Sequence, residues 1–371
     1  MQDSNPYLSE EKAQGFLYDL DWIEKNHAKV DIFIQHVFTE QDADGFWDFV
    51  YRYPQQARMI VQDYFTSNFD KWRIFFYNLL TGERGETIIV VGDKGMGKDV
   101  VTQWIVEVHE LARKMQTIEG DMTEFQIEEM DYQFKKERGI RRSWYHPLTI
   151  KLAKWITNSN LPLFHHVCWA GFYFDYLPRY FKVIKNISSA PEKSLTCLNE
   201  GAIFYSSKRG MRNFALEATY HLATSRHRDQ TLMIVTQSTA LLQLDFLRMC
   251  DCIIKKPMTE VHENLERKTL GIIASLMKPK DYRQTYISYR GYNTLCTNPL
   301  PRYWGERFSK SMTFIKTEDE ARKEAVKLFQ RGLSSTDISI MLGSRGFDRP
   351  AKWYDIDPKI QAELADSSEK K

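Results

Sequence analysis

The chain has 371 residues, of which 43% are hydrophobic and 27% charged, and its formal net charge is +2. These values are typical of a soluble globular protein with more than one domain, and they exclude a polyanion-binding surface that covers the whole molecule, so any nucleic-acid contact must be a local patch. Because no apolar run approaches the ~20 residues of a membrane-spanning helix, and the N-terminus is polar, we expect a cytoplasmic protein without direct membrane insertion.

Residues 1–82 are rich in aromatic residues at helical spacing, such as Phe46, Val50 and Tyr51. This periodicity predicts a helical N-terminal domain. No recognisable catalytic motif lies in it.

Residues 83–292 are predicted to form an α/β core. Short apolar runs predict strands at 87–91, 166–170, 195–198 and 232–235, with a further pair at 252–254 and 285–289. Since helical segments separate them, the strands are expected to form a mostly parallel sheet. Within this core, residues 115–160 are acidic in their first half and basic in their second. We predict an inserted helical hairpin with two solvated faces, the alternative being a DNA contact.

The strongest motif, GDKGMGKD, follows the first strand and precedes an amphipathic helix. It fits the phosphate-binding pattern G-x-x-x-x-G-K. Glycines let successive backbone N–H groups turn toward phosphate oxygens, the helix N-terminus favours the same anion, and the lysine neutralises it. The alternative is a glycine turn with an incidental lysine. We predict that ATP is bound by Gly92, Asp93, Lys94, Gly95, Met96, Gly97, Lys98, Asp99 and Val100.

Two residues depart from the usual magnesium-binding pattern. Asp99 stands where a Ser or Thr hydroxyl is usual, and Asn199 stands at the end of the 195–198 strand, where an acid is usual. We hypothesise that the carboxylate that holds Mg²⁺ has moved from the second strand to the loop, with Asp99 and Asn199 as the metal ligands. The alternative is that both changes reflect decay and that nucleotide is bound without turnover.

Two further polar residues follow predicted strands. Glu200, next to Asn199, is the candidate base that positions the attacking water. Gln237 follows the 232–235 strand, at a position where open α/β sheets bind ligands. If that strand lies beside the loop strand, Gln237 can contact the γ-phosphate. Alternatively, it is an ordinary amide at the end of a strand.

Three motifs in this order, GDKGMGKD, LTCLNE and ATSRHRDQTLMIVTQS, resemble the FtsK–HerA superfamily of P-loop motors. The branch with zonula occludens toxin-like and virus-type ATPases is the most similar, over residues 87–256. The resemblance implies a RecA-like core, a ring-forming homo-oligomer such as a hexamer, and DNA as the partner. Lys98 matches the phosphate lysine, Glu200 the catalytic glutamate and Gln237 the sensor glutamine. Arg226 or Arg228 lies where such rings offer an arginine to the neighbouring subunit, and either can equally be a surface arginine.

Residues 293–317, with two prolines, are predicted to form a linker. Residues 318–371 predict a helix-turn-helix-like module with a disordered tail, with Gly332 ending one helix and Ser334 capping the next. Its third helix would follow, started by Ser344, Arg345, Arg349 and Lys352. A helical hairpin packed on the core and a protein-docking module are alternatives.

A basic loop, Lys208–Arg212, is either a solvated loop or a DNA contact in the pore of a ring. The sequence therefore predicts an ATP- and Mg²⁺-dependent motor that translocates or packages DNA. Two alternatives remain: a non-hydrolysing nucleotide-dependent regulator or scaffold, and an ATPase that acts on protein in secretion or assembly.

Overall fold

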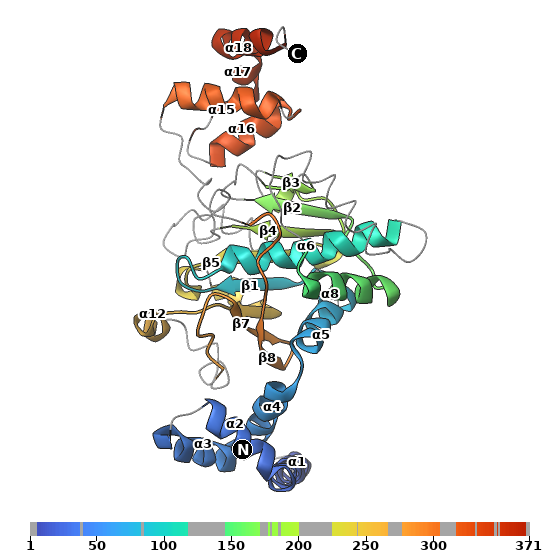
Figure 1. Ribbon diagram of the computed structural model, residues 1–371, viewed down its shortest axis with the longest axis vertical. Helices are drawn as coiled ribbons and strands as arrows, with labels where there is room; N and C mark the ends of the chain where they lie inside the picture. The colour runs from blue at the N-terminus through green and yellow to red at the C-terminus, as the bar shows by residue number, and fades with distance from the viewer. Residues whose placement is uncertain are drawn as a thin grey trace.

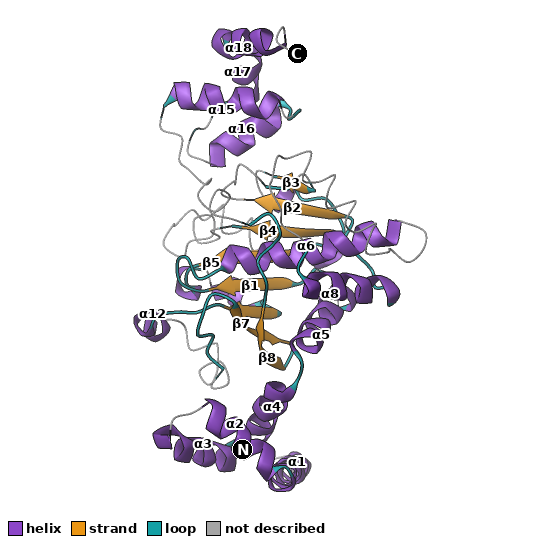
Figure 2. Cartoon of the chain, viewed as in Figure 1, coloured by secondary structure: helices purple, strands orange, loops and turns teal. Residues whose placement is uncertain are grey.

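The structure is a computed structural model that describes residues 6–37, 40–82, 85–117, 145–170, 177–178, 180–184, 187–199, 225–242, 244–265, 277–304, 317–330, 332–344, 347 and 349–368. A central α/β core lies between a group of N-terminal helices and a group of C-terminal helices (Figure 1 and Figure 2). Glu200, the basic loop Lys208–Arg212 and residues 118–144 of the predicted insertion lie outside the described residues.

The described strands form one sheet in the spatial order β3-β2-β4-β5-β1-β6-β7-β8. Their bounds are β1 Thr87–Val91, β2 His166–Ala170, β3 Phe181–Val183, β4 Ser194–Leu198, β5 Thr231–Thr236, β6 Cys252–Lys255, β7 Gln284–Tyr289 and β8 Tyr292–Thr297. The strands from β3 to β6 in this order are parallel, and β7 and β8 are antiparallel. The predicted mostly parallel sheet is thus confirmed.

Two strands were not predicted. β3 has only three residues, too short for a periodic signal. β8 occupies Tyr292–Thr297, so the predicted linker begins with a strand, and the prolines that suggested a linker follow it. Residues 292–297 form a strand because they pair with β7 in an antiparallel hairpin, in which Tyr289 is paired to Tyr292.

Alternate residues of the buried strands face two separate cores, as expected for a sheet covered on both sides. Ile88, Val90 and Cys197 face the core that contains helices α6 (Lys98–Thr117) and α8 (Pro147–Asn158), which lie together on one face (Figure 1). Ile89 and Val91 face the opposite core. α8 falls in the range predicted as an insertion, but it packs on α6 and α5 as part of the core.

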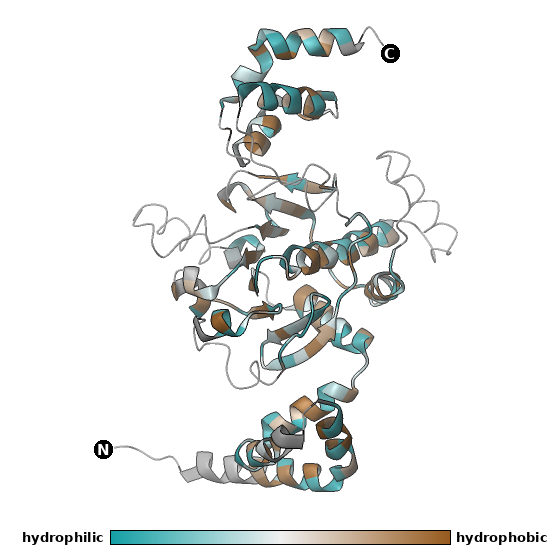
Figure 3. Ribbon diagram, turned by 60° about the vertical axis from the view of Figure 1, so that its left-hand side comes forward, coloured by the Kyte–Doolittle hydropathy of each residue, from teal (hydrophilic) through white to brown (hydrophobic). Residues whose placement is uncertain are grey.

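The N-terminal helices are α1 (Pro6–Lys25), α2 (His27–Val37), α3 (Glu40–Arg52), α4 (Pro54–Phe65) and α5 (Asn68–Thr81). Apolar and polar residues alternate around these helices (Figure 3). Side chains such as Phe33, Phe46 and Val50 form a core with Tyr286 of β7 and Met277, whereas the buried side chains of α5 belong to the core that contains α6 and α8. None of the helices that the structure describes is long and apolar enough to cross a membrane.

Side chains of α4 and α5 cover the outer edge of β8. Asn68 makes two hydrogen bonds to the backbone of Thr297, at 2.8 and 2.9 Å, and the Trp72 indole donates to the same carbonyl at 2.8 Å. Lys71 donates to Leu295 O at 2.8 Å, and the Leu295 N–H donates to Asp63 at 3.0 Å. These side chains satisfy the backbone groups that an edge strand otherwise leaves open for pairing with another chain.

The C-terminal helices are α15 (Glu318–Gln330), α16 (Ser335–Ser344), α17 (Ala351–Ile356) and α18 (Pro358–Ser368). Gly332 follows α15 with φ +81°, and Ser334 accepts from the Asp337 N–H at 3.2 Å, as the predicted stop and cap require. Lys352 lies in α17, whereas Ser344 ends α16. The predicted disordered tail is residues 366–371; residues 366–368 lie in α18 and are helical, and residues 369–371 lie outside the described residues.

Candidate functional site

The loop between β1 and α6 passes close to other backbone and side-chain atoms, so that a side chain on two of its glycines would crowd them. A Cβ on Gly92 would lie 2.7 Å from the Lys256 Cβ, and one on Gly97 would lie 3.0 Å from the Tyr282 carbonyl oxygen. Gly97 also has φ +83°, which side chains disfavour. The loop therefore needs these glycines both for its backbone shape and for its packing.

Lys98, at the start of α6, is turned into the loop. Its side chain is buried, with 6% of the residue exposed, and Nζ donates to the carbonyl oxygens of Gly92 and Asp93, both at 2.9 Å. These bonds hold the amine beside the glycines. A bound phosphate would offer it stronger, charged acceptors.

Asp93 connects the loop to the segment after β6, a link that the sequence does not signal because the second position of the motif accepts many residues. One carboxylate oxygen accepts from the Thr259 N–H at 2.6 Å, and the other forms a hydrogen bond with His262 Nδ1. Burial acts to raise the pKa of the Asp93 carboxyl, but the bonds from His262 and Thr259 outweigh it and hold this pKa below its usual value. The loop is thereby tied to α12 (Glu260–Leu265).

The predicted polar residues meet the loop at one edge of the sheet. β5 lies beside β1, with Thr236 paired to Val91, so Gln237 follows at the level of Gly92 and is exposed. β4 lies beside β5 and ends in Asn199. Because the carboxyl ends of parallel strands share one edge, Gln237 and Asn199 both lie at the edge from which the loop emerges.

Asp99 and Asn199 have properties that fit a magnesium site. Asp99 is half-buried in the first turn of α6. Burial is the main cause of the raised pKa of the Cys197 thiol on β4, and the charges of Cys168 and Asp99 raise it further. Asn199 is 1% exposed, and neither polar atom of its side chain has a hydrogen-bond partner among the described residues.

A carboxylate and an amide oxygen are suitable ligands for a hard cation, which in such sites takes further ligands from phosphates and water. The described part of the chain contains no cluster of three His, Cys, Asp or Glu side chains that can hold a metal ion by itself. Gln103, one turn after Asp99 on α6, is also fully buried without a hydrogen-bond partner for its amide in the described structure. Its position inside the amphipathic helix α6, outside the loop motif, gives no signal of this burial in the sequence.

The sheet order and the loop geometry together decide the fold. The core is a P-loop NTPase fold. The sequence itself matches no protein-family model and no curated protein.

Several solved structures are similar to the chain. One is the genome-packaging NTPase B204 from Sulfolobus turreted icosahedral virus 2 in complex with ATPγS, with 12% identity over 58% of this chain and 98% of that chain and a TM-score of 0.33. Another is the N-terminal domain of zonular occludens toxin from Neisseria meningitidis, with 12% identity, 59% and 96% coverage and a TM-score of 0.29. A third is EssC, ATPases 2 and 3, from Geobacillus thermodenitrificans, with 10% identity, 67% and 45% coverage and a TM-score of 0.29.

These structures are P-loop ATPases of the FtsK–HerA type, which the sequence motifs also resemble. At such TM-scores they add no argument about the site, and the assignment of the fold rests on the strand order and the loop of this chain.

The two candidate arginines of the P-loop core do not lie at the edge of the sheet from which the phosphate loop emerges. The short 3₁₀ helix Arg226–Arg228 precedes β5 and therefore lies at its amino end, opposite the loop. The Arg228 guanidinium donates to the carbonyl of Ala190 at 3.0 Å, a contact with a structural role. Within one chain, neither arginine is brought to the loop.

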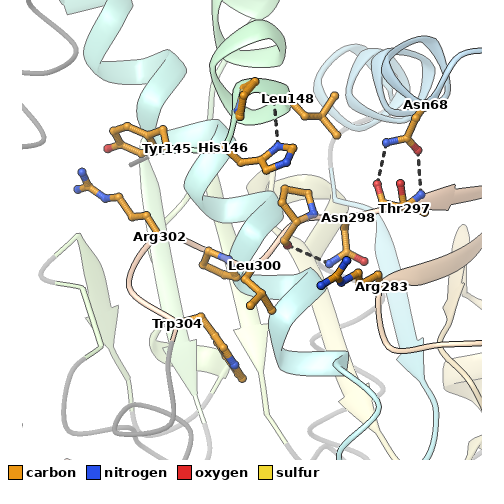
Figure 4. Close-up of a pocket in the computed structure, with 13 residues that line it drawn as sticks. Asn68, Tyr145, His146, Leu148, Arg283, Thr297, Asn298, Leu300, Arg302 and Trp304 are labelled. Atoms are coloured by element: carbon orange, nitrogen blue, oxygen red, sulfur yellow. Dashed lines mark hydrogen bonds between the residues drawn. The ribbon is translucent and has the colours of Figure 1, made fainter. Parts of the chain in front are cut away.

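A hollow of about 750 Å³ lies between α5, α8 and the segment that follows β8 (Figure 4). Asn68 and Thr297 bond each other across one side of it, and His146 accepts from the Leu148 N–H at 3.1 Å to cap α8. Its lining includes Asn298 but no residue of the phosphate loop. This hollow is therefore separate from the phosphate site.

Proposed function

We propose that this chain binds ATP with Mg²⁺ at Gly92–Val100 and hydrolyses it to move DNA through a homo-oligomeric ring. The observation that carries the proposal is the buried Lys98 amine, held by loop carbonyls at the start of a 20-residue helix, with Gln237 directly after β5 at the level of Gly92. A helix N-terminus, inward-facing backbone N–H groups and a lysine form a site for phosphate groups.

Each residue has a proposed role. Lys98 exchanges its carbonyl partners for the β- and γ-phosphates, and Gln237 contacts the γ-phosphate or the attacking water. Glu200 orients that water, while Asp99 and Asn199 hold the metal. Mg²⁺, when bound, supplies positive charge that neutralises the phosphate oxygens.

The DNA-moving part of the proposal is supported by local features and by similarity. The similar structures include a viral genome-packaging NTPase. The sequence of residues 208–212 contains the basic residues Lys208, Arg209 and Arg212, whose charge suits a phosphate backbone. Because Arg226 and Arg228 lie at the far edge of their own sheet, we propose that one of them acts on the nucleotide of a neighbouring subunit.

A second candidate function is a nucleotide-dependent regulator or scaffold that does not hydrolyse ATP, and an ATPase acting on protein is a further alternative. The observation that favours the non-hydrolysing candidate is Asn199, a neutral and almost fully buried amide at the position where an acid is usual. An amide cannot supply the negative charge that a metal-holding carboxylate does.

The test is ATP turnover by the purified protein with Mg²⁺, with and without double- and single-stranded DNA. We expect DNA to increase turnover, Lys98→Ala to abolish nucleotide binding, and Glu200→Gln to bind without turnover. Lys182→Ala, an exposed lysine on β3, is the control and should behave as the wild type. Binding without turnover under every condition would contradict the motor and leave the regulator.

The carboxylate exchange has its own test in the variants Asp99→Ser, Asn199→Asp and the double variant. If the carboxylate has moved between the two positions, each single change should lower turnover on the order of 100-fold, because a metal ion stabilises the transition-state charge by several kcal/mol. The double variant should recover most of the turnover. Additive losses in the double variant would argue against the exchange.

A further inference from the structure

Lys256, the residue after β6, lies directly beneath the phosphate loop. It is fully buried, and its N–H donates to Val91 O at 2.8 Å. Its Cβ lies 2.7 Å from the place a Cβ on Gly92 would take, and its Cε lies 3.4 Å from that place at Gly97. The aliphatic part of this side chain therefore runs under the loop from its first glycine to its last.

The amine of Lys256 ends in a small polar network of neutral groups. Nζ donates to Thr285 Oγ1 at 2.9 Å and to Asn298 Oδ1 at 3.0 Å, and the Thr285 hydroxyl donates to the same Asn298 oxygen at 2.7 Å. Asn298 is fixed in turn by its bond to the Pro299 carbonyl at 3.1 Å (Figure 4). Among the described residues Lys256 has no carboxylate in an ion pair.

A buried amine without a carboxylate partner is costly to charge. Burial accordingly lowers the pKa of Lys256 to about 7. The other lysine at this end of β6, Lys255, differs in this respect, because it is paired with Glu263 at 2.8 Å. A polyanion on the upper side of the loop would supply the negative charge that Lys256 lacks.

We propose that Lys256 is a positioning residue that supports the phosphate loop from below and adds a second positive charge to the phosphate site, so that nucleotide affinity depends on its protonation. This inference rests on the proposed nucleotide binding. It goes further by assigning a second lysine to the phosphate site and a pH dependence to the affinity.

Two ionisable groups of the described residues act on the charge of the amine. The Cys296 thiol on β8 and Asp281, in the turn before β7, both act to keep it charged. Lys98 and Asp93 belong to the loop against which the Lys256 side chain packs.

The sign of the pH effect follows from linkage. An opposite charge nearby raises the pKa of an amine by about one unit or more, and one unit corresponds to about tenfold tighter binding of the anion. The contribution of Lys256 is therefore complete below the pKa of the free protein, about 7. It is lost as the pH rises through the higher pKa of the complex.

The experiment measures the dissociation constant of AMPPNP with Mg²⁺ from pH 6 to pH 9 for wild type, Lys256→Met and Lys256→Arg. Dividing the dissociation constant of Lys256→Met by that of the wild type cancels the titration of the nucleotide itself. We expect this ratio to be about ten at pH 6 and to approach one near pH 9. Lys256→Arg, which stays charged, should bind with a weaker pH dependence than the wild type.

Lys255→Met is the matched control, since Glu263 keeps a second partner, Lys278, at 2.5 Å. Its ratio to wild type should not change with pH. Thr285→Val is a second test that keeps the lysine and removes one acceptor, and it should move the transition to lower pH. The proposal would be overturned if the ratio of dissociation constants for Lys256→Met did not depend on pH. It would also be overturned if the pH at which the affinity changes were the same in Thr285→Val as in the wild type.

Two failures are distinguishable in this experiment. If wild type and Lys98→Ala bind AMPPNP equally poorly, the proposed nucleotide site itself is wrong. If the wild type binds and Lys98→Ala does not, while Lys256→Met keeps the wild-type profile, only the role of Lys256 is wrong.

Discussion

The buried ion pair that covers the edge of β8 should stabilise the fold strongly. Lys71 is 7% exposed, and its amine donates to Asp63 at 3.0 Å and to Leu295 O at 2.8 Å. The same Asp63 oxygen accepts from the Leu295 N–H at 3.0 Å. Lys71→Met would fill much of the same volume but would remove both of these donations.

The size of the loss follows from burial. Breaking a buried pair by removing one partner costs about 3–5 kcal/mol, because the remaining charge is left without compensation. Burial is the main cause that raises the pKa of Asp63, and Lys71 opposes it. Without Lys71 this pKa rises further, so the carboxyl takes up a proton more easily as the pH falls. The loss in free energy of unfolding should therefore be smaller at pH 5 than at pH 7.

The assay is urea denaturation of wild type, Lys71→Met and the double variant Asp63→Asn/Lys71→Met at both pH values. The double variant should recover at least half of the loss, since it removes the uncompensated charge. Lys25→Met is the control, because Lys25 pairs with Asp21 on the exposed surface, where solvent screens the attraction, so its removal should leave the stability almost unchanged. A loss below ~1 kcal/mol for Lys71→Met at pH 7 would refute the reasoning.

Two further predictions concern the loop. Gly97→Ala should weaken nucleotide binding by roughly tenfold or more, because the new methyl group crowds Tyr282 in addition to the cost of a positive φ. Gly95 is the control, since it has a similar φ of +79° but no atom within 4 Å of a Cβ placed there. Calorimetry should show a smaller loss of nucleotide affinity for Gly95→Ala than for Gly97→Ala. The Asp93 carboxyl has a lowered pKa in the fold, so its bond to the Thr259 N–H should persist above its unfolded pKa and be lost as the pH falls through the folded value. Amide exchange at Thr259, corrected for its intrinsic rate, should show this loss of protection on acidification, and Asp93→Asn should weaken protection already at neutral pH.

Local patterns in the sequence were sufficient to predict the strand, the glycine loop and the helix around the GDKGMGKD motif, and the helix cap at Ser334. The β-branched run before GDKGMGKD is β1, and the amphipathic run after it is α6. Ser334 and Asp337 form the predicted cap, because a helix N-terminus is determined by residues three positions apart. In each case the residues that decide the structure are neighbours in the chain, so their spacing alone carries the information.

Contacts between distant residues were decided only by the tertiary structure. Lys256 lies under a loop more than 150 residues earlier in the chain, and Asp93 is bonded to Thr259 across 166 positions. β8 was predicted as linker because its pairing with β7, and the side chains of α4 and α5 that cover its edge, leave no periodic signal in its own residues. Such contacts form when separate segments pack to bury apolar surface, and the energy of that packing depends on the whole fold and not on the spacing of residues within one segment.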